Sequence, residues 1–281
     1  MAAADIEDVV KKTIEELKKK ELIPEYEQHE EKITEVLKKV AQTEAKLTTK
    51  MGRFIENRDM REVEQAMSAI IGQDRVDDIK MAFAIESFSI NVTEKKNGQS
   101  VVQVYRNGVP FQPERMLISI KDIETATVLQ WASIVIELFL FVLSCVGIIV
   151  CLNQAEMRAL VKKVEGIVKQ AAVLEALNKF MKDWNQDIFS TWRKAKDIFH
   201  LLKEIYSLGK FWEIIKLIFK DMYKWEKIKS MVDVVLMIVV AFTTEGIALI
   251  ARIALAIDSH IYLKSKIKNI ITLSDIKKTM E

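Results

Sequence analysis

The chain has 281 residues, of which 50% are hydrophobic and 29% are charged, and its formal net charge at pH 7 is +2. This apolar content excludes an intrinsically disordered protein, and the length suits one large domain or two modest ones. The near-neutral total predicts no particular partner, but the charge is unevenly distributed. Residues 1–127 contain 20 Lys and Arg against 24 Asp and Glu, whereas residues 153–230 contain 16 against 10. An acidic region and a basic region are therefore separated by an almost uncharged middle stretch.

The N-terminal region predicts amphipathic helices. Residues 4–21 place apolar side chains on one helical face, and Pro24 ends this helix. Residues 26–58 space their apolar side chains by three, four or seven, close to a coiled-coil seam that Glu44 interrupts. A third helix is expected over residues 60–86, with Gly72 as a possible break. We expect these helices to form part of a bundle and to supply contacts between copies of the chain.

The pattern changes after residue 86. Phe88, Ile90 and Val92 alternate with small polar residues, which is the period of a β-strand. Asn97-Gly98 separates this run from a second alternating run, and this dipeptide is typical of hairpin turns. The sequence therefore predicts a β-hairpin over about residues 87–105.

The stretch from Val128 to Leu152 has 25 residues and a single charge, Glu137. As one helix it would be roughly 37 Å long, more than a bilayer core of about 30 Å. The alternative is the central helix of a soluble bundle, buried on every side, although the stretch is long for that role. We predict that it contacts acyl chains during function. The predicted membrane-inserting residues are Val128, Trp131, Leu138, Phe139, Leu140, Phe141, Leu143, Ile148, Ile149 and Leu152.

Residues 179–229 combine eleven aromatic residues with twelve Lys and Arg and seven acidic residues. Trp and Tyr prefer the headgroup level of a membrane and Lys favours anionic lipid, so the region fits an interfacial helix pair. The alternative is that these aromatic side chains form the core of a soluble bundle. Nucleic-acid binding is disfavoured because the basic residues alternate with acids and form no clean patch. The predicted interfacial residues are Trp184, Trp192, Phe211, Trp212 and Trp225.

A second apolar stretch, Met231 to Ile257, is interrupted by Asp233, Glu245 and Arg252. In an antiparallel helical hairpin of the two stretches, Glu137 and Arg252 would differ in depth by roughly 6 Å. We predict a buried ion pair between them, which would offset the cost of a carboxylate at membrane depth. The alternative is that Glu137 faces water or a polar cavity.

The sequence carries no catalytic or metal-binding signature. His29, His200 and His260 are far apart, and the chain has no CxxC pair, phosphate loop or nucleophile elbow. Cys145 and Cys151 are six residues apart, on different faces of a helix, and cannot form a disulfide within it. We expect no enzymatic activity, no cofactor, no metal and no small-molecule substrate.

The expected fold is mainly α, with long amphipathic helices in a bundle, a small β-hairpin and two long apolar helices. The expected regions are an amphipathic helical region (1–86), a hairpin and connection (87–127), an apolar membrane segment (128–152), basic aromatic helices (153–230), a second apolar helix (231–257) and a basic amphipathic tail (258–281).

This layout is similar to that of α-helical pore-forming proteins, in which amphipathic helices and a short β-rich interruption accompany an apolar segment that becomes the membrane head. The resemblance implies a membrane-active protein that inserts an apolar helical hairpin, as an oligomeric pore former or a membrane-remodelling protein. One alternative is a constitutive two-span integral membrane protein with a cytosolic adaptor or scaffold region. Another is a soluble helical bundle that binds other proteins.

The expected partners are a lipid bilayer and further copies of the chain. The first 20 residues have no apolar core between their charges, so no secretory signal is predicted. Permanent spanning by both apolar stretches would place the Lys-rich 153–230 region in the cytoplasm and force residues 1–127 across the membrane. We therefore expect a membrane-associated protein, at the cytosolic face or released by a non-classical route.

Overall fold

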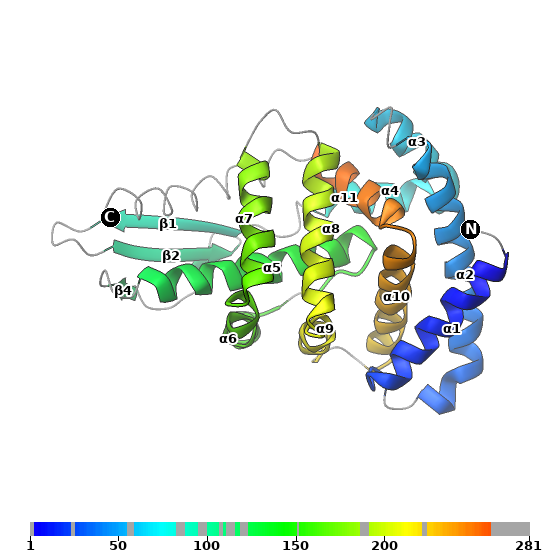
Figure 1. Ribbon diagram of the computed structural model, residues 1–281, viewed down its shortest axis with the longest axis horizontal. Helices are drawn as coiled ribbons and strands as arrows, with labels where there is room; N and C mark the ends of the chain where they lie inside the picture. Colours follow the sequence, from blue (N-terminus) through cyan, green and yellow to red (C-terminus); the bar gives the residue numbers. More distant parts are fainter. Residues whose placement is uncertain are drawn as a thin grey trace.

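The computed structural model describes residues 3–23, 26–54, 59–82, 88–94, 100–106, 109–110, 116–118, 123–150, 152–185, 191–220 and 224–259. These residues are mainly helical, as predicted, with eleven α-helices and four short strands among them (Figure 1). The predicted basic tail at 258–281 lies outside the described residues except for its first two positions.

Four helices form the N-terminal part: α1 (Ala3–Lys19), α2 (Tyr26–Gly52), α3 (Met60–Ile71) and α4 (Gln73–Met81). The Asp59 side chain accepts a hydrogen bond from the backbone N–H of Arg61 and caps α3. Gly72, whose φ is 90°, separates α3 from α4, because glycine adopts positive φ without steric cost. The helix expected over 60–86 is therefore two helices, divided at the glycine that was expected as a possible break.

The segment expected to form a hairpin contains β1 (Phe88–Glu94) and β2 (Ser100–Arg106). They pair antiparallel, with Phe88 opposite Arg106 and Glu94 opposite Ser100. Two shorter strands, β3 (Val109–Pro110) and β4 (Met116–Ile118), also pair with β2. The turn predicted at Asn97-Gly98 lies outside the described residues. Figure 1 shows β1 and β2 at one end of the helical body, beside the start of α5.

Five helices form the middle of the chain: α5 (Ile123–Cys145), α6 (Gln154–Val168), α7 (Ala171–Asn185), α8 (Thr191–Ser207) and α9 (Phe211–Ile218). Helices α7 and α8 pack side by side, and α5 runs behind them in Figure 1. Asn153 and Glu156 form a capping box that begins α6. The basic aromatic region therefore folds as short amphipathic helices packed over α5 and its neighbours.

The first apolar stretch is not a single helix. α5 ends at Cys145, and the chain turns at Gly147, whose φ is 84°. The N–H of Ile148 donates to the carbonyl of Leu143, and the N–H of Gly147 donates to that of Ser144. These are the two hydrogen bonds of the Schellman motif, which stops a helix at a glycine. The prediction of one helix through residue 152 is wrong for this reason.

The second apolar stretch is also divided, into α10 (Lys224–Thr243) and α11 (Ile247–Ser259). The hydroxyl groups of Thr243 and Thr244 donate to backbone carbonyls one turn earlier, and Glu245 and Gly246 have positive φ values of 54° and 74°. Hydroxyl back-bonding and left-handed residues both favour a helix end over its continuation. The single helix predicted over 231–257 is therefore wrong.

No single helix in the described residues is both long and apolar enough to cross a membrane. Lys227–Thr243 and Ile247–Ser259 meet the length and composition only as a pair, and this pair is bent by 108° at its break.

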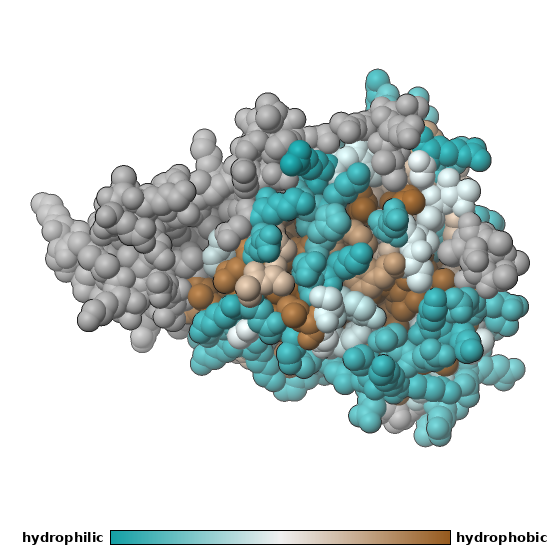
Figure 2. Space-filling model, viewed as in Figure 1, coloured by the Kyte–Doolittle hydropathy of each residue, from teal (hydrophilic) through white to brown (hydrophobic). Residues whose placement is uncertain are grey.

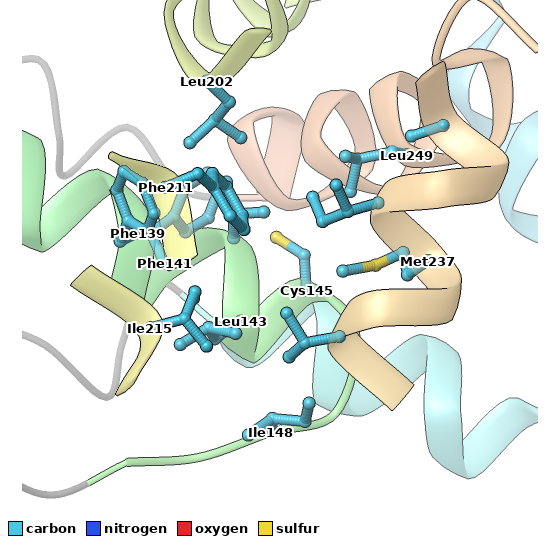
Figure 3. Packing of buried hydrophobic residues seen from close by; sticks show 14 of the residues in the cluster. Phe139, Phe141, Leu143, Cys145, Ile148, Leu202, Phe211, Ile215, Met237 and Leu249 are labelled. Atoms are coloured by element: carbon cyan, nitrogen blue, oxygen red, sulfur yellow. The ribbon is translucent and has the colours of Figure 1, made fainter. Parts of the chain in front are cut away.

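Helix α5 lies at the centre of the core. From Ala132 to Cys145 every residue is buried except Glu137, which is partly exposed. Figure 3 shows its aromatic side chains beside Phe211 of α9, and the ring centroids of Phe139 and Phe211 are 5.0 Å apart. Figure 3 also shows the thiol of Cys145 on the side of α5 nearest to α10. Other helices therefore cover this segment on all sides, as in the soluble-bundle alternative.

The amphipathic helices form the outside of this core. α1 packs on α10, α2 packs on α10 and α11, α6 packs on α5, and α8 packs on α11. On the face seen in Figure 2, the described surface is largely hydrophilic, and hydrophobic atoms are visible mainly between the helices. Each fully buried Leu, Ile or Phe contributes about 1.5–3 kcal/mol, so this apolar core is the main source of stability.

We predict that Gly246→Ala lowers the free energy of unfolding by about 1–3 kcal/mol, measured by urea denaturation. Alanine is strained at a φ of 74°, and its Cβ would lie 2.6 Å from the Phe199 ring. The matched control is Gly166→Ala, in the exposed last turn of α6, where a Cβ meets no atom within 4 Å. This control should raise stability by about 0.5–1 kcal/mol. Equal stability of Gly246→Ala and the natural chain would contradict the assignment of this turn.

Candidate functional site

A buried ion pair joins α2 to α11. Arg252 donates from Nη1 to Oε2 of Glu44 at 2.8 Å, and its Nη2 donates to Oε1 of the same carboxylate. Each side chain is 7% exposed. The two residues are 208 positions apart in sequence, so the contact forms only in the tertiary structure.

The predicted partner of Arg252 is therefore wrong. The guanidinium that was expected to meet Glu137 pairs with Glu44, the residue that interrupts the apolar seam of α2. The prediction considered only the two apolar stretches as an antiparallel pair. In the structure α11 lies against α2 and α4, which brings an N-terminal carboxylate to Arg252 instead.

This pair is surrounded by an apolar core, which gives it a particular energetic character. Removing both charges from water costs several kcal/mol per ion, and their bidentate contact offsets that cost only while both partners are present. Each charge alone would be strongly destabilising at this position. The pair therefore fixes how α11 sits against α2 more strictly than apolar contacts do.

A cavity of about 370 Å³ opens beside the ion pair. It lies between α2, α3, α4, α10, α11 and the turn that follows α5. Its wall has an apolar part, which includes Val40, Ile71, Ile79 and Met237. The charged residues that line the cavity are Lys39, Glu44, Arg75, Asp233 and Arg252.

Two of these charged residues have no close partner. Lys39 forms an ion pair with Glu35 at 2.7 Å, and Glu44 is held by Arg252. Within the part of the chain that the structure describes, Arg75 and Asp233 have neither a hydrogen bond of their side chains nor an ion pair within 4 Å. The Arg75 guanidinium instead occupies the space that a Cβ at Gly147 would take.

The structure places most of the predicted membrane-inserting residues in the core. Leu138, Phe139, Leu140, Phe141, Leu143 and Ile148 are buried, and Val128, Trp131 and Leu152 are partly buried. Ile149 is the exception, with 52% of its surface exposed just after the Gly147 turn. In this folded state the stretch meets protein, and its contact with lipid stays a prediction.

The predicted interfacial aromatic residues also belong to the core where they are described. Trp192, Phe211 and Trp212 are 2–3% exposed, so the interfacial prediction does not apply to this folded state. The side chains of Trp184 and Trp225 lie outside the described residues. The indole N–H groups of Trp192 and Trp212 are buried, and no described residue accepts a hydrogen bond from them. A buried donor without a partner costs stability.

A second polar cluster lies between α7 and α8, around a cavity of about 300 Å³. Lys179 Nζ is 3.6 Å from Oδ1 of Asp197, whose side chain is 4% exposed. Burial, followed by the positive charge of Lys179, lowers the pKa of His200 below its usual value. The described residues include no group of three or more His, Cys, Asp and Glu side chains placed to hold a metal ion.

Comparison with known proteins finds no matching family model, no similar curated protein and no similar solved structure.

We predict that Arg252→Met lowers the free energy of unfolding by about 3–5 kcal/mol, because it leaves the Glu44 carboxylate buried without its cation. The double variant Glu44→Leu, Arg252→Met should recover most of this loss, since apolar residues of similar volume can replace a buried pair. Urea denaturation measures both. Lys39→Met, which removes an exposed ion pair, is the control and should change stability by less than about 1 kcal/mol. A double variant as unstable as the single would contradict the pairing.

We also predict that His200 makes the fold less stable in mild acid. Lys179 on α7 and Lys196 and Lys203 on α8 lower the pKa of His200, Glu204 opposes them, and burial is the largest cause. The unfolded state then binds the proton more tightly, so stability is complete above a pH of about 6.5 and falls as the pH drops through that value. Denaturation of the natural chain and of His200→Gln from pH 8 to pH 5 tests this. The variant should lose less stability, and parallel pH profiles would contradict the role of His200.

Proposed function

We propose that the protein is a membrane-active helical bundle. It folds with its apolar segments inside and transfers them to a lipid bilayer, where they form a helical hairpin in an oligomeric pore or a remodelled membrane. The observation that supports this most directly is the position of α5, α10 and α11. These helices, the most apolar long segments, are enclosed by amphipathic helices, and each apolar stretch is folded back at a glycine turn.

Moving the apolar side chains from the protein core into a bilayer costs little free energy. Lipid tails are as apolar as leucine side chains, so a residue such as Leu140 loses little when it exchanges a protein core for acyl chains. The hydrophobic effect therefore holds these segments away from water but does not choose between the two environments. Polar contacts and turn geometry decide which environment the segments occupy.

The charges within the apolar stretches oppose insertion. Glu137, Asp233 and Arg252 would each cost about 2.5–3.5 kcal/mol at the centre of a bilayer if left charged and unpaired. In the folded bundle Arg252 has Glu44 as its partner, and α2 would have to separate from α11 before α11 could leave the core. The ion pair therefore stabilises the folded bundle relative to the inserted state.

The glycine turns set the length of the apolar segments. In the folded state the Gly147 and Gly246 turns interrupt both stretches, and the second is bent by 108°. Continuous helices over 128–152 and 231–257 would be roughly 37 Å and 40 Å long, enough to cross a hydrocarbon core. Straightening at these two positions would convert core elements into membrane-spanning ones.

The test is dye release from anionic phospholipid vesicles by the natural chain and by Ile149→Asp. Ile149 is exposed in the folded state, so the substitution should leave the bundle intact, as circular dichroism would verify. In the inserted state it would place a carboxylate near one end of the membrane segment, where the charge opposes entry into the hydrocarbon. We expect dye release to fall at least about threefold, since each 1.4 kcal/mol changes an equilibrium by a factor of ten.

Met81→Asp is the matched control, because Met81 has the same 52% exposure but lies at the end of α4. It should release dye like the natural chain. Equal release by Ile149→Asp and Met81→Asp would remove the first apolar stretch from the mechanism. A chain that stays soluble without detergent and releases no dye would support the soluble interaction protein instead.

A further inference from the structure

The cavity beside the Glu44–Arg252 pair has the features of a small-ligand site. Its volume of about 370 Å³ lies in the range of ligand pockets, and such pockets commonly form between the helices of bundles. Its lining combines apolar side chains with five charged ones. It also touches the Gly147 turn, at which the first apolar stretch folds back.

The charges that are open to a ligand have opposite signs. Glu44 and Arg252 form an ion pair with each other, and Lys39 forms one with Glu35. Arg75 and Asp233 remain, and neither has a side-chain hydrogen bond or a close ion pair among the described residues. Burial is the largest influence on Asp233 and raises the pKa of its carboxyl; Lys229 and Arg75 attract this carboxylate, and Glu44 repels it.

A ligand that satisfies both groups must itself carry both charges. A guanidinium binds phosphate through parallel N–H donors, and a half-buried carboxylate accepts hydrogen bonds from a primary ammonium. A quaternary ammonium fits less well, because it is recognised by aromatic faces and none of the described residues that line this cavity is aromatic. The chemistry of the cavity therefore favours a zwitterion that carries an anionic group, such as a phosphate, and a primary ammonium.

We infer that this cavity binds a phosphoethanolamine group, with its phosphate on Arg75 and its ammonium on Asp233. The choice of phosphate over another anion rests on the proposed membrane function, in which the ligand is the headgroup of an ethanolamine phospholipid. Free phosphoethanolamine has the same recognition chemistry, so binding can be measured without a membrane.

Binding at this site would act on the turn that shortens the first apolar stretch. The Arg75 guanidinium lies directly against Gly147. A phosphate that draws Arg75 into the cavity takes this side chain away from the turn. Headgroup recognition and release of the apolar segment are thereby coupled through one side chain.

The test is calorimetric titration of the full-length chain with O-phosphoethanolamine, inorganic phosphate, ethanolamine and phosphocholine. We expect O-phosphoethanolamine to bind at least about tenfold more tightly than the other three, the equivalent of 1.4 kcal/mol. Arg75→Gln and Asp233→Asn should each weaken it by a similar factor. Arg61→Gln is the matched control: Arg61 lies at the start of α3 with a side chain 90% exposed, and its loss should leave binding unchanged.

Vesicles distinguish a lipid headgroup from a free metabolite. Co-sedimentation with phosphatidylethanolamine vesicles, compared with phosphatidylcholine vesicles, should show a preference that Arg75→Gln abolishes. No heat of binding with O-phosphoethanolamine, equal affinity for inorganic phosphate, or unchanged binding by Arg75→Gln would overturn the inference. Dye release that persists alongside any of these results would leave the membrane proposal standing and remove only this site. Binding of O-phosphoethanolamine without dye release would support this site and contradict the membrane proposal.

Discussion

The ion pair between Glu44 and Arg252 is the constraint on which the arrangement of this bundle depends. Apolar contacts are non-directional, so several packings of α11 against α2 would bury similar area. Only a packing that brings the guanidinium onto the carboxylate avoids leaving two charges alone in a core. The N-terminal amphipathic helices and the last apolar helix are thereby tied together across most of the chain.

The same constraint links stability to the proposed mechanism. The most apolar long helices, α5, α10 and α11, lie in the core and are covered by amphipathic helices. In the proposed mechanism the Glu44–Arg252 ion pair determines whether they stay there. The free energy of transferring their apolar side chains from the core to lipid is small, because the core and the bilayer are similar solvents for them. In the proposed mechanism the control points are therefore the buried charges and the two glycine turns. A side chain covers each turn: Arg75 at Gly147 and Phe199 at Gly246.

Several features could be read from particular residues in advance. The apolar faces of the N-terminal helices follow from their spacing. The apolar stretch predicted that residues such as Phe139 avoid water, but the sequence predicted lipid around them, whereas in this folded state they lie in the protein core. The helix ends at Gly147 and Gly246 were visible as glycines within apolar runs, but hydropathy outweighed them in the prediction. Glu44 was visible as a break in a seam, and a break of this kind signals a buried polar contact without naming its partner.

The sequence by itself determined that the chain is mainly helical, which faces of its helices are apolar, and that two stretches must be shielded from water. These properties depend on local spacing and composition. Only the tertiary structure decided that protein supplies the shielding in this state, that Trp192 and Trp212 lie in the core, and that Arg252 pairs with Glu44 rather than Glu137. The physical reason is that hydrophobic burial specifies no partner, whereas a buried charge requires one, and the packing of distant helices selects which one it meets.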